Sequence, residues 1–347
     1  MEASIKTIVG LALLVALLPT TASAAGTAAP TYSVTRSVAL GSPDRWDYIT
    51  VDTATQRVYV SHGDRVTVVD GSTGALLGQV TGFPGGTHGI AISTANGKGY
   101  TDDGEAGTVG AFDLKTLKLT RSIAGRPDAD GIVLDPASGH LFVSNGESMD
   151  VSVVDPKTDR NIGNIKTGGK VEFETADGKG KLYVNGEEKE EIIRIDTRTN
   201  QVDAHWPLTS CRSPHGIAMD VATRRLFVGC TNEMLVVVSA DDGREVAHLA
   251  IGKGSDAVVF DPVRKRVFSS NGRDGTITIL GETDAEHFVS LGEVKTGVTA
   301  RTMAINPVSG RLYVAVADVE SGTAAGTARP KISSGSLKLL FLDPSPP

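Results

Sequence analysis

The stretch from Gly131 to Thr158, GIVLDPASGHLFVSNGESMDVSVVDPKT, decides the fold. It predicts strands at 131–135, 140–144 and 150–155, because β-branched and aromatic residues alternate there with turns of Pro, Gly, Asn and Ser. A weaker fourth strand follows at 160–165. Four short strands bounded by turns are typical of one blade of a β-propeller.

Versions of this stretch recur along the chain. A basic or polar residue opens the second strand of each unit, at Arg57, Lys98, His140, Lys181, Arg225, Arg266 and Arg311. Successive positions are 41 to 45 residues apart. This period predicts an all-β, seven-bladed β-propeller of four-stranded blades, in which each blade packs against its neighbours. We therefore expect one domain over residues 25–347.

The two ends of the chain complement each other. Residues 31–40 predict a strand before the first full unit, whereas the last unit stops after its third strand at 337–343. We expect the N-terminal strand to complete the last blade. That pairing closes the ring and leaves no free sheet edge between the ends.

Residues 1–24 have the pattern of a secretory signal peptide. Lys6 precedes an apolar run at 8–18, and the small residues 22–24 (ASA) fit a cleavage site. The run is too short to span a bilayer. We expect cleavage after Ala24, a periplasmic or secreted protein and no membrane span in the mature chain; a retained anchor is the alternative.

Composition narrows the classes of partner. The chain has 40% hydrophobic and 22% charged residues, as globular proteins do, and its formal net charge is −7. A negative chain without a groove of basic and aromatic residues does not favour nucleic-acid binding. We expect a monomer that binds a small molecule or a protein.

The second strands carry the phrases YVSH, FVSN, YVNG, FVGC, FSSN and YVAV. Over about residues 31–343 the chain resembles the YVTN-repeat propellers, the YncE-like exported proteins, and residues 142–145 (FVSN) come nearest to YVTN. The resemblance implies a propeller and export. It implies no particular activity, because YncE-like proteins have no single agreed one.

Polar residues precede most first strands. In units one to seven the residues at this place are Asp47, His88, Asp130, Val171, His215, Asp256 and Arg301. By analogy with other propellers, they are expected at one mouth of the central channel, the usual place for a ligand. An alternative is a structural rim whose side chains bond nearby backbone amides.

Units one to three are the richest part of this predicted ring. The candidate metal ligands are Asp47, His88, Asp130 and His62, and Asp102, Asp103 and Asn145 are expected at the same mouth. Imidazoles with carboxylates suit zinc, manganese or iron, whereas carboxylates with amides suit calcium. Without a metal, His88 and His215 are candidates for general acid–base catalysis.

Two further residues at this mouth have candidate roles. Trp46 offers a face on which a ring-shaped ligand can stack, or it packs in the core. Arg301 is a candidate anchor for an anion, or it forms an ion pair within the rim.

The chain has two cysteines. Cys211 precedes the first strand of unit five and Cys230 ends its second strand, so both are expected at the same mouth. In an exported protein this favours a disulfide. A thiolate metal site with His215 is the alternative.

Unit seven contains an insertion at residues 317–336, rich in Gly, Ala, Ser and Thr. Its expected place is the same mouth. It is a lid, a partner-binding loop or a tolerated surface insertion.

Two classes of function remain. The first is a binding or scaffold protein that holds a small ligand, a metal ion or a partner protein at the mouth. The second is a metal-dependent hydrolase or lyase that resembles propeller lactonases and uses the His and Asp residues there. Covalent haem attachment and a serine nucleophile elbow are excluded because the chain lacks CxxCH and GxSxG.

Overall fold

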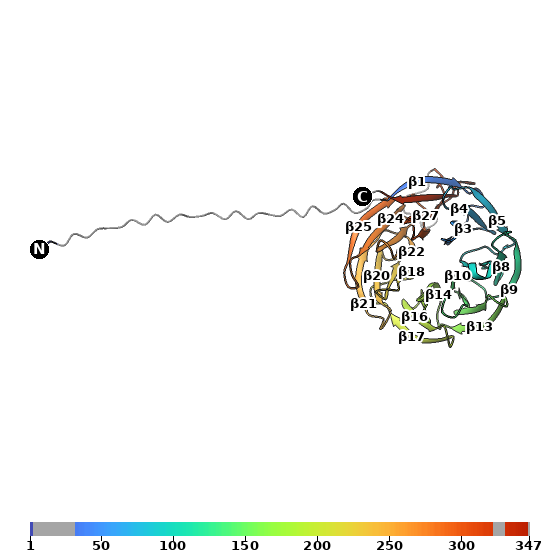
Figure 1. Cartoon of the computed structure of the whole chain (residues 1–347), viewed down its shortest axis with the longest axis horizontal. Coiled ribbons are helices and arrows are strands. Elements are labelled where there is room, and N and C mark those ends of the chain that lie inside the picture. The colour runs from blue at the N-terminus through green and yellow to red at the C-terminus, as the bar shows by residue number, and fades with distance from the viewer. Residues whose placement is uncertain (3–31, 322–329, 346–347) are drawn as a thin grey trace.

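Four-stranded antiparallel sheets repeat seven times, as the period of the sequence predicts. The computed structural model describes residues 1–2, 32–321 and 330–345. Figure 1 shows the sheets arranged as blades around a central axis, with the first strand of each blade innermost. The predicted seven-bladed β-propeller is confirmed.

Blades 1 to 3 take consecutive strands from the axis outward. Blade 1 is β2 (Ile49–Asp52), β3 (Arg57–His62), β4 (Arg65–Asp70) and β5 (Leu76–Thr81). Blade 2 is β6 (Ile90–Ser93), β7 (Lys98–Asp103), β8 (Thr108–Asp113) and β9 (Leu119–Ala124), with the 3-10 turn η1 (Thr94–Asn96) after β6. Blade 3 is β10 (Ala129–Leu134), β11 (Leu141–Asn145), β12 (Asp150–Asp155) and β13 (Arg160–Lys166).

Blades 4 to 6 follow the same order. Blade 4 is β14 (Val171–Ala176), β15 (Lys181–Gly186), β16 (Glu191–Asp196) and β17 (Gln201–Pro207). Blade 5 is β18 (Pro214–Asp220), β19 (Arg225–Cys230), β20 (Met234–Ser239) and β21 (Glu245–Ala250). Blade 6 is β22 (Ser255–Asp261), β23 (Arg266–Asn271), β24 (Thr276–Glu282) and β25 (Phe288–Lys295).

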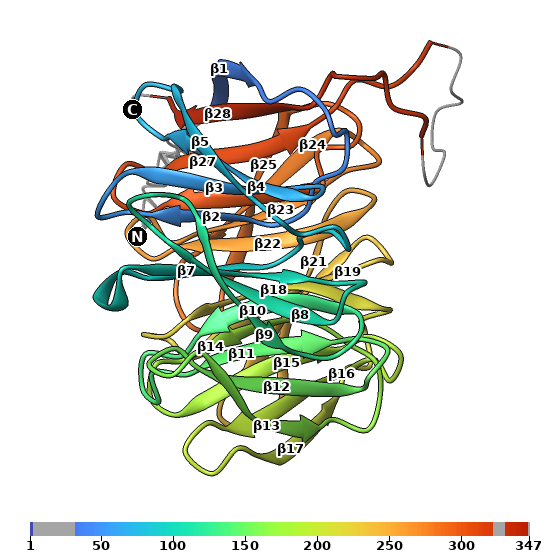
Figure 2. The ribbon, with the colours of Figure 1, turned by 90° about the vertical axis from the view of Figure 1, so that its right-hand side faces the viewer.

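Blade 7 joins the two ends of the chain. It contains β26 (Thr302–Asn306), β27 (Arg311–Val316), β28 (Lys338–Pro344) and β1 (Tyr32–Ala39), and β1 pairs antiparallel with β28. Ser33 lies opposite Asp343 and Ala39 opposite Lys338, and Figure 2 shows the two strands side by side. The predicted closure by the N-terminal strand is confirmed.

A buried aromatic ring in the second strand of every blade forms the core between blades. These rings belong to Tyr59, Tyr100, Phe142, Tyr183, Phe227, Phe268 and Tyr313. Three of the tyrosines also donate a hydrogen bond to a turn of the next blade; Tyr313 Oη, for example, lies 2.9 Å from the Gly71 carbonyl oxygen. The repeated aromatic position thus fixes neighbouring blades relative to one another, with about 1 kcal/mol per hydrogen bond.

Most of the predicted signal peptide, residues 3–24, lies outside the described residues. Among those that are described, no helix has the length and apolar character needed to cross a membrane.

Candidate ligand-binding site

A β-bulge presents a polar side chain at the start of several inner strands. In blades 3 to 6 the pairing of the first two strands shifts register just after its first pair. Asp130, Glu172, His215 and Asp256 each follow that first pair and lie outside the regular ladder. Bulges of this kind redirect a side chain, here toward the channel mouth.

The bulge also corrects one prediction. Val171 pairs with Gly186 as Ala129 pairs with Asn145, so the residue equivalent to Asp130 in blade 4 is Glu172. The prediction of Val171 at this place is wrong by one residue. The position therefore carries a titratable group in every blade.

We call these seven residues the charged ring: Asp47, His88, Asp130, Glu172, His215, Asp256 and Arg301. Contacts link several neighbours around it. Arg301 lies 2.6 Å from Asp256 and 3.1 Å from Asp47, and His215 Nδ1 lies 3.5 Å from Asp256 and 3.9 Å from Glu172.

The charged ring borders a cavity of about 680 Å³, which we call the mouth cavity. Its lining includes Arg45, Trp46, Asp47, His88, His215, Asp256, Arg273, Val298, Arg301 and Ile332. Its volume is in the range of small-molecule sites, and its lining combines charged groups with apolar surface.

Two aromatic rings lie deeper in the channel. Tyr48, which precedes β2, stacks on Phe173 of β14 with ring centroids 4.1 Å apart. Both also line a second cavity, of about 350 Å³, whose other walls include Ile49, Val133 and Met303. Burial and the nearby carboxylates of the charged ring raise the pKa of Tyr48 well above its usual value.

The Arg301 guanidinium ties the closing blade to its two neighbours. Besides its ion pairs with Asp47 and Asp256, it donates to the Trp46 carbonyl oxygen at 2.6 Å and lies 6.0 Å from the Trp46 ring centroid. Burial raises the pKa of Asp256, but Arg301 and His215 outweigh burial and lower it to about 2. The arrangement matches the ion-pair alternative for Arg301.

His88 is held by a buried carboxylate that the sequence did not pair with it. Asp102 Oδ2 lies 2.6 Å from His88 Nδ1, and Asp102 Oδ1 accepts the His88 backbone N–H at 3.0 Å. Burial lowers the pKa of the imidazole, but the hydrogen bond and charge of Asp102, with Asp47 and Asp130, raise it to about 9. The raised pKa favours the imidazolium at neutral pH, and His88 Nε2 lies 3.5 Å from an Arg45 guanidinium nitrogen.

His215 lies among carboxylates from two blades. Its Nε2 is 3.7 Å from Glu187 Oε1 and 3.2 Å from Ser213 Oγ, and its Nδ1 faces Asp256 and Glu172. Burial lowers the pKa of His215, and Asp256 and Glu187 outweigh burial and raise it. Glu172, Glu187 and His215 offer three ligand atoms that lie within 4.8 Å of one another.

Other predicted residues lie away from the charged ring. His62 is fully buried, with Nδ1 2.8 Å from Thr67 Oγ1 and Nε2 2.7 Å from the Pro43 carbonyl oxygen. Asp103 accepts the Gly85 backbone N–H at 2.6 Å, and Asn145 donates to Ser152 Oγ and Asp150 within its own blade. Both ring nitrogens of His62 therefore already have oxygen partners within the protein.

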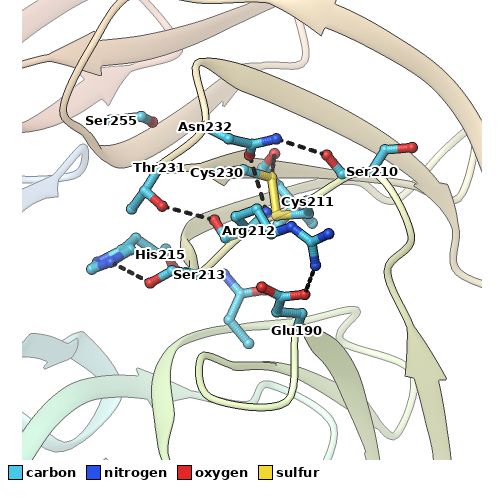
Figure 3. Close-up of a disulfide and its surroundings, with 12 residues drawn as sticks. Glu190, Ser210, Cys211, Arg212, Ser213, His215, Cys230, Thr231, Asn232 and Ser255 are labelled. Carbon is cyan, nitrogen blue, oxygen red and sulfur yellow. Dashed lines mark hydrogen bonds and ion pairs between the residues drawn. A yellow bond between two sulfur atoms is a disulfide. The ribbon is translucent and has the colours of Figure 1, made fainter.

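The predicted disulfide between Cys211 and Cys230 is confirmed. Their Cα atoms are 5.3 Å apart, and both side chains are fully buried. Figure 3 shows the disulfide beside the backbone that carries Ser213 and His215. Because Pro214 pairs with Cys230, the disulfide braces the start of the strand that presents His215.

The insertion in blade 7 borders the mouth cavity. Its described parts, residues 317–321 and 330–336, project from the propeller in Figure 2. They are joined by a bridge between Val319 and Ile332, and Pro330 and Ile332 line the cavity. Residues 322–329 of the predicted loop lie outside the described residues.

Comparison with known proteins supports the fold alone. No family model and no curated protein matches the chain. Among solved structures, it is similar to a chain of Kuenenia stuttgartiensis hydrazine synthase, with 14% identity, a TM-score of 0.68 and coverage of 77% of this chain and 91% of that chain. It is also similar to the WD40 repeats of RRP9, with 10% identity, a TM-score of 0.75 and coverage of 90% and 98%.

The chain is a seven-bladed β-propeller. Its similarity to both structures covers most of the ring, and identities of 10 to 14% show fold and no activity.

Proposed function

We propose that this propeller is a binding protein that holds a small anionic organic molecule, a carboxylate or phosphate ester, in the mouth cavity. The observation that carries the proposal is the approach of two cations there. His88 Nε2 and the Arg45 guanidinium lie 3.5 Å apart, and His88 already uses Nδ1 to donate to Asp102. An anion that accepts hydrogen bonds from both groups would offset the repulsion between two cations at this distance.

The surroundings of this pair support the same ligand class. Arg273 lines the same cavity, and Trp46, Val298 and Ile332 add apolar surface for a carbon skeleton. Within the described residues, the one acidic partner of Arg45 is the exposed Glu105, at 3.8 Å. Its guanidinium is therefore available to bind a ligand, whereas that of Arg301 is engaged by Asp47 and Asp256.

Binding measurements test the proposal. Wild-type protein is titrated calorimetrically with citrate, succinate, glycerol 3-phosphate and neutral glycerol. Arg45→Gln and His88→Gln should each weaken binding of the anionic probes about tenfold or more, whereas Arg198→Gln, on an exposed turn of blade 4, should leave it unchanged. Equal affinity for glycerol, or unchanged affinity in both cavity variants, contradicts the proposal.

The second candidate is a hydrolase or lyase, and the His88–Asp102 pair favours it. A carboxylate that orients an imidazole with its free nitrogen toward a cavity is the arrangement of a general acid–base catalyst. With a pKa of about 9, His88 would act as the acid and donate a proton to a leaving oxygen. His88→Gln should abolish turnover of a lactone panel in a variant that remains folded; retained turnover excludes this role.

We also propose export. The signal pattern at 1–24 and the resemblance to YncE-like proteins support cleavage after Ala24 and a monomeric mature chain, residues 25–347, in the periplasm or outside the cell. N-terminal sequencing of the native protein tests this. A native chain that still begins at Met1 contradicts cleavage after Ala24.

A further inference from the structure

A cluster of Glu172, Glu187 and His215 lies where blades 4 and 5 reach the mouth. Glu172 is in the bulge of β14, Glu187 follows β15, and His215 is in the bulge of β18. One ligand atom from each lies within 4.8 Å of the others, and His215 Nε2 to Glu187 Oε1 is 3.7 Å. Ligand atoms bonded to one tetrahedral zinc ion at about 2.1 Å are roughly 3.4 Å apart, so small side-chain movements suffice.

The charge around this cluster favours a cation. Glu172 is a nearly buried carboxyl whose nearest cationic nitrogens, Lys170 Nζ and His215 Nδ1, lie 3.8 and 3.9 Å from its Oε1, beyond hydrogen-bonding distance. The carboxyl of Asp130 in blade 3 is its hydrogen-bonding neighbour. Two facing carboxyls are stabilised by a shared proton or by a cation between them.

His215 presents Nε2 to Glu187 Oε1 at 3.7 Å. Its other nitrogen, Nδ1, faces Asp256 at 3.5 Å and Glu172 Oε1 at 3.9 Å, so Glu172 turns toward Nε2 when an ion binds, and Asp256 is itself held by Arg301 at 2.6 Å. A carboxylate on the second nitrogen of a ligating imidazole fixes its tautomer and ring orientation. The disulfide between Cys211 and Cys230 restrains the backbone on which this imidazole is mounted.

We propose that Glu172, Glu187 and His215 bind a divalent transition-metal ion of the zinc class. One imidazole with two carboxylates leaves a fourth position open for water or a ligand, and a nitrogen donor favours such an ion over calcium. On binding, the ion takes the place between His215 Nε2 and Glu187 that the Ser213 hydroxyl faces, and that hydroxyl rotates away. The site borders the mouth cavity, whose lining includes His215, but it shares no residue with the Arg45–His88 pair.

Lys170 competes with the ion. Its ammonium lies 2.6 Å from Glu187 Oε2 and neutralises the carboxylate that the metal needs. Removing this charge should therefore strengthen metal binding, an effect that a misfolded variant cannot produce.

Equilibrium dialysis of the mature protein against Zn²⁺, Mn²⁺ and Ca²⁺, with no organic ligand present, tests the site. We expect about one Zn²⁺ per chain, weaker Mn²⁺ binding and no competition by Ca²⁺. Glu187→Gln and His215→Gln should weaken Zn²⁺ binding at least tenfold, and Lys170→Met should strengthen it about tenfold. The matched control is His248→Gln, which removes an exposed histidine beside Glu245 on β21 and should change nothing.

Several results overturn the proposal. The proposal fails if no Zn²⁺ binds, if His248→Gln weakens Zn²⁺ binding as much as His215→Gln does, or if Lys170→Met binds Zn²⁺ no more tightly than wild type. If Glu187→Gln and His215→Gln fail to fold, crystals of wild-type protein grown with Zn²⁺ test the site instead. An anomalous peak between Glu187 and His215 supports the site, and a peak elsewhere or none overturns it. Because anion binding is measured separately, failure here leaves the proposed function standing.

Discussion

Tyr48 of blade 1 and Phe173 of blade 4 stack on each other across the channel, with ring centroids 4.1 Å apart and an interplanar angle of 22°. Each directly follows a member of the charged ring, Asp47 and Glu172. The same backbone turns that place carboxylates at the mouth therefore place two aromatic rings beneath them. The pair lines the second cavity.

Removing one of these rings should cost stability and open the channel. We expect Phe173→Ala to lower the free energy of unfolding by about 2 kcal/mol, because it leaves a void beside Tyr48. Urea unfolding measures the change, with Val263→Ala, on an exposed turn, as the control. An effect no larger than that of the control would show that the stacked pair contributes nothing to stability.

The His88–Asp102 pair predicts a pH dependence. The folded imidazole has a pKa of about 9, against about 6.5 when unfolded, so the folded state binds more protons between these values. The stabilisation from this group, about 3 kcal/mol at most, is complete below pH 6.5 and is lost as the pH rises through 9. Urea unfolding from pH 6 to 10 should show this decline, and His88→Gln should flatten it.

The matched comparison is His248→Gln on the outer strand β21, whose imidazole is exposed. This variant should keep the wild-type decline. A decline of the same size in His88→Gln would mean that the His88 imidazole does not cause it.

The disulfide predicts a redox effect on stability. The bond closes a loop with a sequence separation of 19, and loss of both cysteines in Cys211→Ala with Cys230→Ala should cost about 3 kcal/mol. Because the chain has only these two cysteines, a reducing agent should lower the stability of wild type and leave the double variant unchanged. Sensitivity of the double variant to reductant would contradict this account.

Arg301 should stabilise the junction where the ring closes. Arg301→Met leaves Asp47 and Asp256 without their shared cation, and we expect a loss of about 3 kcal/mol. Thermal and urea unfolding give the value. Arg244→Met removes an exposed ion pair to Glu286 and should lower the free energy of unfolding by less than about 1 kcal/mol. Equal losses in the two variants would show that the ion pairs of Arg301 contribute no more than an exposed pair.

The sequence predicted the fold because each repeat contains the strand and turn pattern of one blade. The same basic or polar residue, buried aromatic and turn recur in each unit, so seven weak signals reinforce one another. The closing strand followed from simple counting of strands at the two ends. The disulfide was predicted because Cys211 precedes β18 and Cys230 ends β19, and these ends of the two strands are paired.

The charged ring was predicted except in blade 4, where the sequence places Val171 at the position that the bulge gives to Glu172. A bulge changes which side chain leaves the ladder, and no residue type in the sequence marks it. Glu187 was missed because its turn follows β15 in an acidic run, EEKEE, in which any member might equally face solvent. The pairing of Asp102 with His88 was missed because it depends on side-chain direction between two strands.

The pairing of β1 with β28 places Tyr32 opposite Pro344. Because the ring of sheets is closed, the order of the blades along the chain can be changed by circular permutation without changing their order in space. Circular permutants that link residues 32 and 345 and open at another surface turn, such as Ser72–Thr73, preserve every sheet. The propeller is in this sense a closed scaffold whose ends, and fusion partners attached to them, can be moved from one blade to another.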